Sequence, residues 1–224
     1  MYELFDETAA GVLLAVNPGE SIRQVAQHLQ TPYETIRQAV NRLEDAGDLA
    51  DGDGLFLTDE HVRERTLTLL ATSAGVSPPS IEEAYVLPQF GDLPFAFARI
   101  DAVYVWTQGG YQVGRDPDDY PLFLAVREQD VEAWQVFFQR FGLPTAFERQ
   151  PRDALDGPLQ IVLDPRSELR PDHVEGYPVV SRNETIDFMH EHYAMFQSAL
   201  AMLDRMYDDL DLDVAYREDE RGRM

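Results

Sequence analysis

The chain has 224 residues, with 41 acidic side chains against 18 lysine plus arginine side chains and a formal net charge of −23. It contains no cysteine and no lysine, so all 18 of those basic side chains are arginine. These absences exclude disulfides, thiolate metal sites and any chemistry that needs a lysine, such as Schiff-base catalysis or a lysine-dependent phosphate loop.

The acidic, lysine-free composition resembles that of cytoplasmic proteins from halophilic archaea. A strongly acidic surface stays hydrated in molar salt, where the Debye length is about 3 Å. The chain has no apolar run long enough for a membrane span, and its N-terminus lacks a charged segment followed by an apolar one. We therefore expect a cytoplasmic protein without membrane contact.

The first third of the chain shows three helical segments. Residues 7–16 are apolar enough for a helix, which Asn17-Pro18-Gly19 would end. Ser21 is suited to cap a second helix. Its apolar side chains recur at helical spacing and predict one buried face. They are Ile22, Val25, Ala26 and Leu29.

A third helix is predicted to begin at Thr31-Pro32-Tyr33-Glu34, which reads as a capping box with proline at the first helical position. Gly47 is suited to end it in the left-handed conformation. Its apolar stripe is Ile36, Ala39, Val40 and Leu43. Residues 49–57 follow as two short extended runs around a glycine-rich turn, which predicts a β-hairpin. Three helices and a hairpin in this order resemble the winged helix-turn-helix.

The polar face of the third helix carries side chains that can pair with base edges in a major groove. We expect Arg37, Gln38, Asn41 and Arg42 to read bases, and Arg23 and Thr35 to contact phosphates. Residues 21–43 carry three arginines and one glutamate, a local charge of +2 (3 − 1). The hairpin carries Asp51 and Asp53, so we do not expect it to enter a minor groove. Winged helices also serve as protein-interaction or structural modules, and that alternative stays open.

The next segments connect this domain, residues 1–76, to a second one. Thr58 is expected to cap a helix that runs to about Ala74. Gly75-Val76-Ser77-Pro78-Pro79 is a linker pattern, and residues 77–94 are expected to be a connection with a short helix at 81–87.

From residue 95 the pattern changes to alternating strands and helices, which predicts a sheet domain over 95–181 and an α+β fold for the whole chain. The predicted strands are 102–106, 122–126, 145–148 and 159–163. Between the second and third of these, Asp130 is expected to cap a helix that Gly142 ends.

A long helix is predicted over 184–210, within a C-terminal segment at 182–212, followed by a charged tail at 213–224. Its apolar residues follow a 3-4 spacing: Ile186, Met189, Tyr193, Phe196, Leu200, Leu203, Tyr207 and Leu210. Such a seam either covers the chain's own sheet or forms a dimer interface. Asp187, His190 and Glu191 share a helix face and could hold a metal, but we expect that face to be solvated.

Residues 103–126 resemble the core motif of the nucleotidyltransferase fold. In that family, Gly-Ser ends a strand and binds triphosphate, and a later Asp-x-Asp pair holds the catalytic divalent metal. This chain has Thr107-Gln108 and Asp119-Tyr120-Pro121 at those places. A lone carboxylate does not hold two magnesium ions. Asp164 is either a relic of the family's third carboxylate or a strand end. The resemblance therefore implies a catalytically silent domain with no cofactor and no metal.

A winged helix joined to such a domain resembles autoregulatory repressors of the antitoxin type. We expect a non-enzymatic transcriptional regulator that binds double-stranded DNA as a homodimer and whose second domain senses a small-molecule effector or binds a protein partner. Two alternatives remain: an active nucleotidyltransferase with atypical metal ligands, and a protein-interaction scaffold that neutralises a partner directly.

Overall fold

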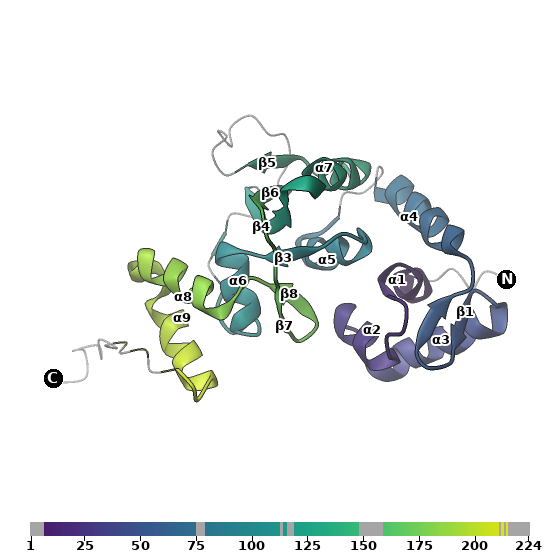
Figure 1. Ribbon diagram of the computed structural model, residues 1–224, viewed down its shortest axis with the longest axis horizontal. Coiled ribbons are helices and arrows are strands. Elements are labelled where there is room, and N and C mark those ends of the chain that lie inside the picture. The colour runs from purple at the N-terminus through teal and green to yellow at the C-terminus, as the bar shows by residue number, and fades with distance from the viewer. Residues whose placement is uncertain are drawn as a thin grey trace.

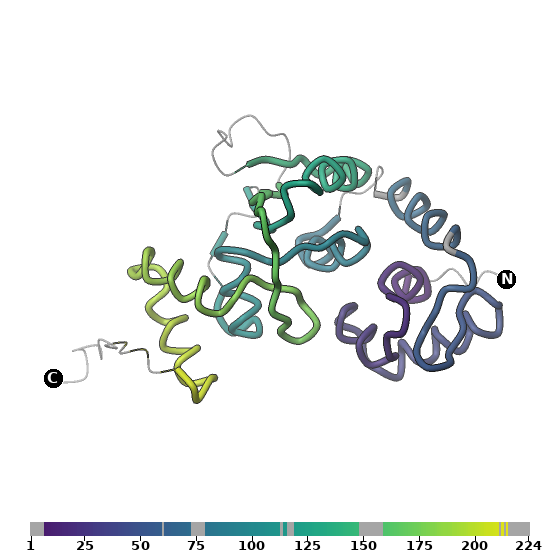
Figure 2. Tube along the Cα trace, viewed as in Figure 1, coloured from purple at the N-terminus to yellow at the C-terminus, as the bar shows by residue number. Residues whose placement is uncertain are grey.

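The computed structural model describes residues 7–74, 79–112, 114–115, 119–147, 159–210, 212 and 214. The fold is α+β, as the sequence predicts, with a two-stranded and a six-stranded sheet among the described residues. The molecule is elongated, with the N-terminal helices at one end, the larger sheet in the middle and the last two helices at the other end (Figure 1, Figure 2). None of the described helices combines the length and the apolar character that a membrane crossing requires.

The N-terminal elements are three helices followed by a two-stranded hairpin, in the order that the sequence predicts. They are α1 (Glu7–Ala15), α2 (Ile22–His28), α3 (Tyr33–Ala46), β1 (Leu49–Asp51) and β2 (Leu55–Leu57). Ser21 and Gln24 form a reciprocal capping box at the start of α2, and Gly47 ends α3 with φ +80°. The predicted stripe of α3 is buried against α1 and α2. A separate hydrophobic core therefore holds this domain together.

The predicted capping box at the start of α3 is wrong. Pro32 is the N-cap, with φ −53° and ψ 136°, and no side chain caps the helix. The Thr31 hydroxyl instead donates to the main-chain oxygen of Leu29 at 3.0 Å. Since that bond closes the end of α2, the hydroxyl serves the preceding helix rather than the following one.

The second predicted cap, Thr58, is wrong as well. Helix α4 (Glu60–Ala74) begins two residues later, where the Asp59 carboxylate accepts a hydrogen bond from the His61 main-chain N–H at 2.9 Å. The Thr58 hydroxyl donates to the main-chain oxygen of Gly47, so it ties the end of the hairpin to the end of α3.

The second domain is a mixed sheet with helices packed on it. Its strands lie in the order β5-β6-β4-β3-β8-β7, with β3 antiparallel to β4 and parallel to β8, and β4 and β5 parallel to β6. The strands are β3 (Phe95–Phe97), β4 (Tyr120–Arg127), β5 (Thr145–Phe147), β6 (Leu159–Arg166), β7 (Asp172–Val174) and β8 (Tyr177–Val179). The helices are α5 (Ile81–Val86), η2 (Leu87–Phe90), α6 (Arg99–Trp106), η3 (Glu128–Asp130), α7 (Val131–Arg140), α8 (Arg182–Glu191) and α9 (Tyr193–Met206).

Large aromatic side chains fill the core between the sheet and two of these helices. Phe95 and Phe97 project from the same face of β3, because side chains two apart on a strand share a face. Phe95 packs edge-on against Trp134 of α7, and Phe97 stacks on Tyr85 of α5. The predicted strands 122–126, 145–148 and 159–163 and the helix after Asp130 are confirmed in type, although residue 148 lies outside the described residues. Asp130 itself makes no capping bond and accepts from Arg127 Nε at 2.5 Å.

The prediction of a strand at 102–106 is wrong, because these residues belong to helix α6. Ala102, Val103, Val105 and Trp106 are all buried, so the segment is apolar on every side and shows neither a helical nor a strand period. The helix is fixed at its first turn by Asp101 and at its end by Thr107, whose hydroxyl donates to the main-chain oxygen of Val103.

The single long helix predicted for residues 184–210 is also wrong, since the chain breaks at His192 into α8 and α9. Phe188 and Phe196 pack across the break with ring centroids 5.3 Å apart. The predicted seam mostly faces the chain's own core, where Met189, Leu200 and Leu203 are fully buried. Three apolar side chains at its edges stay exposed: Tyr193, Met195 and Met206.

Candidate nucleic-acid interface

Helix α3 presents two rows of polar side chains on the face opposite its buried stripe. Residues three and four apart share a helix face, so one row consists of Glu34, Arg37 and Asn41. The second row consists of Thr35, Gln38 and Arg42. All six are exposed except Arg42, which is half-buried. In Figure 1, α3 lies on the side of the winged helix away from the six-stranded sheet. The structure therefore brings five of the six predicted DNA-contacting residues onto one open helix face.

Arg37 is held by a neighbour in its own row. Its Nε and Nη2 donate to the Glu34 carboxylate at 3.0 Å and 2.7 Å. Both side chains are at least half exposed, and such surface pairs exchange readily with solvent, the more so in high salt. The Arg37 guanidinium could therefore exchange its ion pair with Glu34 for hydrogen bonds to another acceptor, such as a base edge. A carboxylate in this row can also accept from a cytosine amino group, a role for Glu34 that the sequence analysis missed.

The remaining predicted contacts are arranged differently. Arg42 Nε donates to the main-chain oxygen of Gln38 at 3.4 Å, which holds its side chain along the helix. Arg23 is exposed in the first turn of α2, a separate helix from the other five. Arg23 therefore lies outside both rows.

The hairpin is tied closely to the turn between α1 and α2. Gly54 has φ +126°, and a side chain there would collide with the backbone of Gly19. Leu55 and Glu20 form a β-bridge beside this contact. The hairpin keeps Asp51 exposed, and Phe56 is 42 % exposed. The surface of the hairpin is therefore acidic and aromatic.

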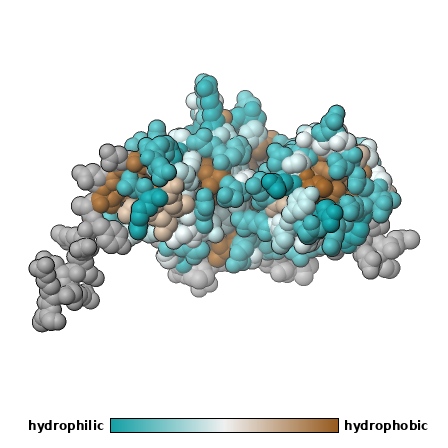
Figure 3. All heavy atoms as spheres, turned by 90° about the horizontal axis from the view of Figure 1, so that it is seen from below, coloured by the Kyte–Doolittle hydropathy of each residue, from teal (hydrophilic) through white to brown (hydrophobic). Residues whose placement is uncertain are grey.

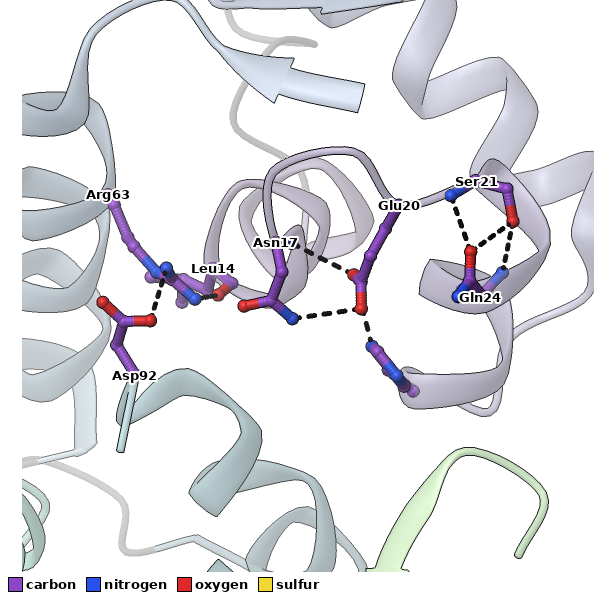
Figure 4. Close-up of polar contacts among 8 residues, drawn as sticks. Leu14, Asn17, Glu20, Ser21, Gln24, Arg63 and Asp92 are labelled. Carbon is purple, nitrogen blue, oxygen red and sulfur yellow. Dashed lines mark hydrogen bonds and ion pairs between the residues drawn. The ribbon is translucent and has the colours of Figure 1, made fainter. Parts of the chain in front are cut away.

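Polar contacts fix the winged helix to the second domain (Figure 4). Arg63 of α4 donates from Nη2 to the main-chain oxygen of Leu14 at 2.6 Å, and its Nη1 lies 3.3 Å from the Asp92 carboxylate. In the same view, Glu20 accepts from the main-chain and side-chain nitrogens of Asn17. A second ion pair, Arg140 with Glu64, joins α7 to α4 at 3.2 Å. The winged helix is therefore a fixed part of the molecule.

The turn between β7 and β8 packs directly on the helix-turn-helix. Gly176 has φ +86°, and a Cβ at that position would come within 3.0 Å of Gln27 Cβ and 3.3 Å of His28 Cδ2. His28 Nδ1 also lies 3.7 Å from the Glu20 carboxylate. His28 therefore lies where the two domains meet and not on the exposed face of α3.

A buried polar cluster that the sequence analysis missed lies beside this seam. Asp101 is fully buried at the start of α6. Its carboxylate accepts hydrogen bonds from Arg115 Nη2 at 2.6 Å, from the Phe123 main-chain N–H at 2.7 Å and from the Tyr85 hydroxyl. The only sequence signal for it was one carboxylate inside an otherwise apolar stretch.

The electrostatics of this cluster keep its guanidinium charged and its phenol neutral. Burial disfavours the charged form of Arg115, but Asp101 more than offsets this, and the pKa of Arg115 is raised. Burial, reinforced by the charge of Asp101, raises the pKa of Tyr85 far above its ordinary value. The cluster is therefore a paired, internally satisfied network.

The positions that carry the likeness to nucleotidyltransferases have structural roles. Thr107 ends α6, and the Pro121 main-chain oxygen accepts from Arg115 at 2.6 Å. Asp164 pairs with Arg166 at 2.8 Å. The first strand of the expected motif is in fact helix α6. The spacing within residues 103–126 therefore no longer supports a resemblance to the nucleotidyltransferase fold. Over the described ranges, no three His, Asp or Glu side chains are grouped to hold a metal, including those of α8.

Much of the surface is polar, as the composition requires. The face shown in Figure 3 is mostly hydrophilic, with separate small hydrophobic patches. Comparison with family models, with curated proteins and with solved structures gave no match to this chain. The likeness to winged-helix regulators therefore rests on the elements and side chains described above.

Proposed function

We propose that this protein is a DNA-binding transcriptional regulator that reads the major groove with α3. The observation that carries the proposal is the pair of polar rows on that helix, in which Arg37, Gln38 and Asn41 are exposed. Arginine pairs bidentately with guanine, and asparagine or glutamine with adenine. A helix of this kind in a helix-turn-helix enters the groove with its first turns against the bases.

The distribution of charge supports this proposal despite the acidic surface. Residues 21–43 sum to +2, so the other residues sum to −25 (−23 − 2). In molar salt the Debye length is about 3 Å, so distant carboxylates are screened while direct contacts on α3 persist. Binding should then depend on base contacts more than on phosphate attraction, since counterion release supplies little at that salt concentration.

The second domain supports a binding role rather than a catalytic one. Its residues at the nucleotidyltransferase positions cap a helix, accept a structural hydrogen bond or pair with an arginine. The domain is also fixed to the winged helix on two sides, through Arg63 and through Gly176. We propose that it is a regulatory domain that controls DNA binding by the N-terminal domain.

The direct test is selection of DNA from a random library by the intact protein in molar KCl. Fluorescence anisotropy on an enriched sequence then compares the parent with Asn41→Ala and Arg37→Ala. Each variant should lose about tenfold or more in affinity for that sequence, because one bidentate base contact contributes about 1–3 kcal/mol. Arg170→Ala is the matched control, since that exposed arginine lies far along the chain and pairs only with exposed Glu168. Unchanged affinity in Arg37→Ala and Asn41→Ala would exclude α3 as the reader.

One observation favours a second candidate function, binding of a protein partner through the hairpin. Asp51 and Asp53 carry negative charge beside Phe56, and that exposed aromatic ring is unusual for a DNA-binding wing. A photo-crosslinking amino acid in place of Phe56 would capture a protein in cells if this candidate is right. Crosslinks to DNA alone would exclude it.

A further inference from the structure

A cavity of about 460 Å³ lies where the helix-turn-helix meets the second domain. Five tyrosines line it: Tyr85, Tyr104, Tyr111, Tyr120 and Tyr177. Gln30 reaches it from the turn between α2 and α3, and Glu82 reaches it from α5. Its volume lies in the range of small-molecule sites in proteins, which are usually few and lined by aromatic side chains.

Among the described residues that line the cavity, the one arginine is already paired with a carboxylate. Arg115 pairs with Asp101 at 2.6 Å and lies over the Tyr120 ring, with Cζ 4.3 Å from the ring centroid. Its other terminal nitrogen donates to the main-chain oxygen of Pro121. With its charge and donors engaged, Arg115 offers little to a phosphate or carboxylate group.

Acceptor groups, in contrast, remain open. Within the part of the chain that the structure describes, no hydrogen bond reaches the hydroxyl of Tyr104 or of Tyr177, and Tyr177 is only 6 % exposed. Glu82 is an exposed residue and has no ion pair among these same residues. The formal charges of Arg115, Asp101 and Glu82 sum to −1 (one arginine and two carboxylates). The unpaired charge of the cavity is therefore negative.

We propose that this cavity binds a small organic ammonium ion. The faces of tyrosine rings carry negative potential, and a cation over several such rings is stabilised most when it is shielded from water. The open phenol oxygens and the Glu82 carboxylate add acceptors for ammonium or N-methyl groups. An anion would meet the Glu82 carboxylate and a guanidinium that is already paired with Asp101.

The site is placed to influence the DNA-binding domain. Gln30 has φ +48° and forms the turn that orients α3 relative to α2. Tyr177 follows Gly176 directly, and Gly176 packs on Gln27 and His28 of α2. A ligand that contacts Gln30 and Tyr177 therefore touches the α2–α3 turn directly and also the strand next to the β7–β8 turn, which packs on α2. This part of the inference rests on the proposed DNA-binding function, whereas ligand binding itself does not.

Calorimetric titration of the intact protein tests binding, with choline chloride as the probe and the total chloride salt held constant. We expect saturable one-to-one binding of choline, and no binding of adenosine or inorganic phosphate. Tyr104→Leu should weaken choline binding about tenfold, whereas Tyr104→Phe should keep it within about threefold because the ring remains. Glu82→Gln should weaken it by about threefold or more, and Glu132→Gln on α7 is the matched control. Circular dichroism and thermal melting verify that each variant is folded.

Three results would overturn the ligand assignment: no saturation by choline, tighter binding of adenosine or phosphate than of choline, or equal choline binding in Glu82→Gln and Glu132→Gln. Coupling is tested separately by DNA anisotropy with and without choline. We expect choline to change the affinity for the selected DNA by about fivefold or more and Gln30→Ala to reduce that change. Choline binding without any DNA binding contradicts the proposed function but leaves the ligand site standing. Choline binding with unaltered DNA affinity contradicts the coupling alone.

Discussion

Arg63 of α4 lies 3.3 Å from the carboxylate of Asp92, and this pair joins the winged helix to the loop that leads into the central sheet. The two residues contribute unequally. The Arg63 side chain is mostly buried and also donates to the main-chain oxygen of Leu14, whereas the Asp92 carboxylate is mostly exposed. The arginine is therefore a clamp between two helices and the second domain, with the aspartate as its outer partner.

Substitution of Arg63 should destabilise the protein more than substitution of Asp92. Arg63→Ala should lower the free energy of unfolding by about 1–3 kcal/mol, because it leaves a main-chain acceptor of α1 without its partner. Asp92→Asn should cost less than about 1 kcal/mol, as exposed ion pairs do. Urea titration at constant high salt measures both values. Equal losses in the two variants would contradict this assignment of roles.

The reading face of α3 should determine sequence specificity and not overall stability. In the double variant Arg37→Ala with Asn41→Ala, thermal melting should stay close to that of the parent, because both side chains are exposed and lie off the buried stripe. Binding to the selected DNA should fall toward the level of unrelated DNA, since about 1–3 kcal/mol is lost for each base contact. Anisotropy against both sequences measures the ratio. A ratio equal to that of the parent contradicts the prediction.

Alkaline pH should unfold the protein through its buried tyrosines. Burial raises the pKa of Tyr85 above that of the unfolded chain, which is about 10. The resulting stability is fully present below about pH 10 and is lost as the pH rises from there toward the folded-state pKa, because the unfolded state then releases the proton first. Each such tyrosine should lower the free energy of unfolding by about 1.4 kcal/mol per pH unit in that range.

The matched variants Tyr85→Phe and Tyr193→Phe isolate this contribution. Tyr85→Phe should reduce the slope of stability against pH above pH 10 by about one proton, whatever it does to stability at neutral pH. Tyr193 is exposed on α9, so Tyr193→Phe is the matched control that removes a hydroxyl from the surface. Urea titrations at several alkaline pH values give the slopes. An unchanged slope in Tyr85→Phe would show that its phenol is not kept neutral by the fold.

Two substitutions on α9 should separate core packing from self-association. Leu200 is fully buried, so Leu200→Asp should unfold the protein or cost at least about 3 kcal/mol. Met195 is 52 % exposed, so Met195→Asp should leave the fold intact. The homodimer stays a prediction: the parent should have twice the 25.5 kDa chain mass by light scattering, and Met195→Asp should give the monomer. A monomeric parent at micromolar concentration contradicts it.

The position of α9 also bears on how such a dimer would meet DNA. Because α9 and the N-terminal helices lie at opposite ends of the molecule, a dimer joined end to end through α9 carries its two copies of α3 at its two outer ends (Figure 2). We expect such an end-to-end dimer to need half-sites spaced more widely than a single DNA turn of about 34 Å. Footprints of widely spaced half-sites are therefore expected, and adjacent protected half-sites would point to a different interface.

The sequence by itself determined the three N-terminal helices and the hairpin, because the interactions that define them are local. The capping box of Ser21 and Gln24, the left-handed Gly47 and the amphipathic stripe of α3 all lie within a few residues of one another. The exposed polar face of α3 was also predictable from the sequence, since it lies opposite the apolar stripe that the helix buries. The candidate reading residues were therefore visible before any tertiary contact was known.

Only the tertiary structure decided what residues 99–107 and 182–206 form and where the tyrosine-lined cavity lies. A segment that is buried on all sides has the same apolar pattern whether it forms a helix or a strand. The start of α6 is held by Asp101, whose hydrogen-bond partners Arg115 and Phe123 lie 14 and 22 residues away in the chain. The break at His192 has no local glycine or proline and accompanies packing of Phe188 on Phe196. The cavity joins Gln30 to Tyr177 across the fold, and side chains this distant in the chain meet only when both domains have packed.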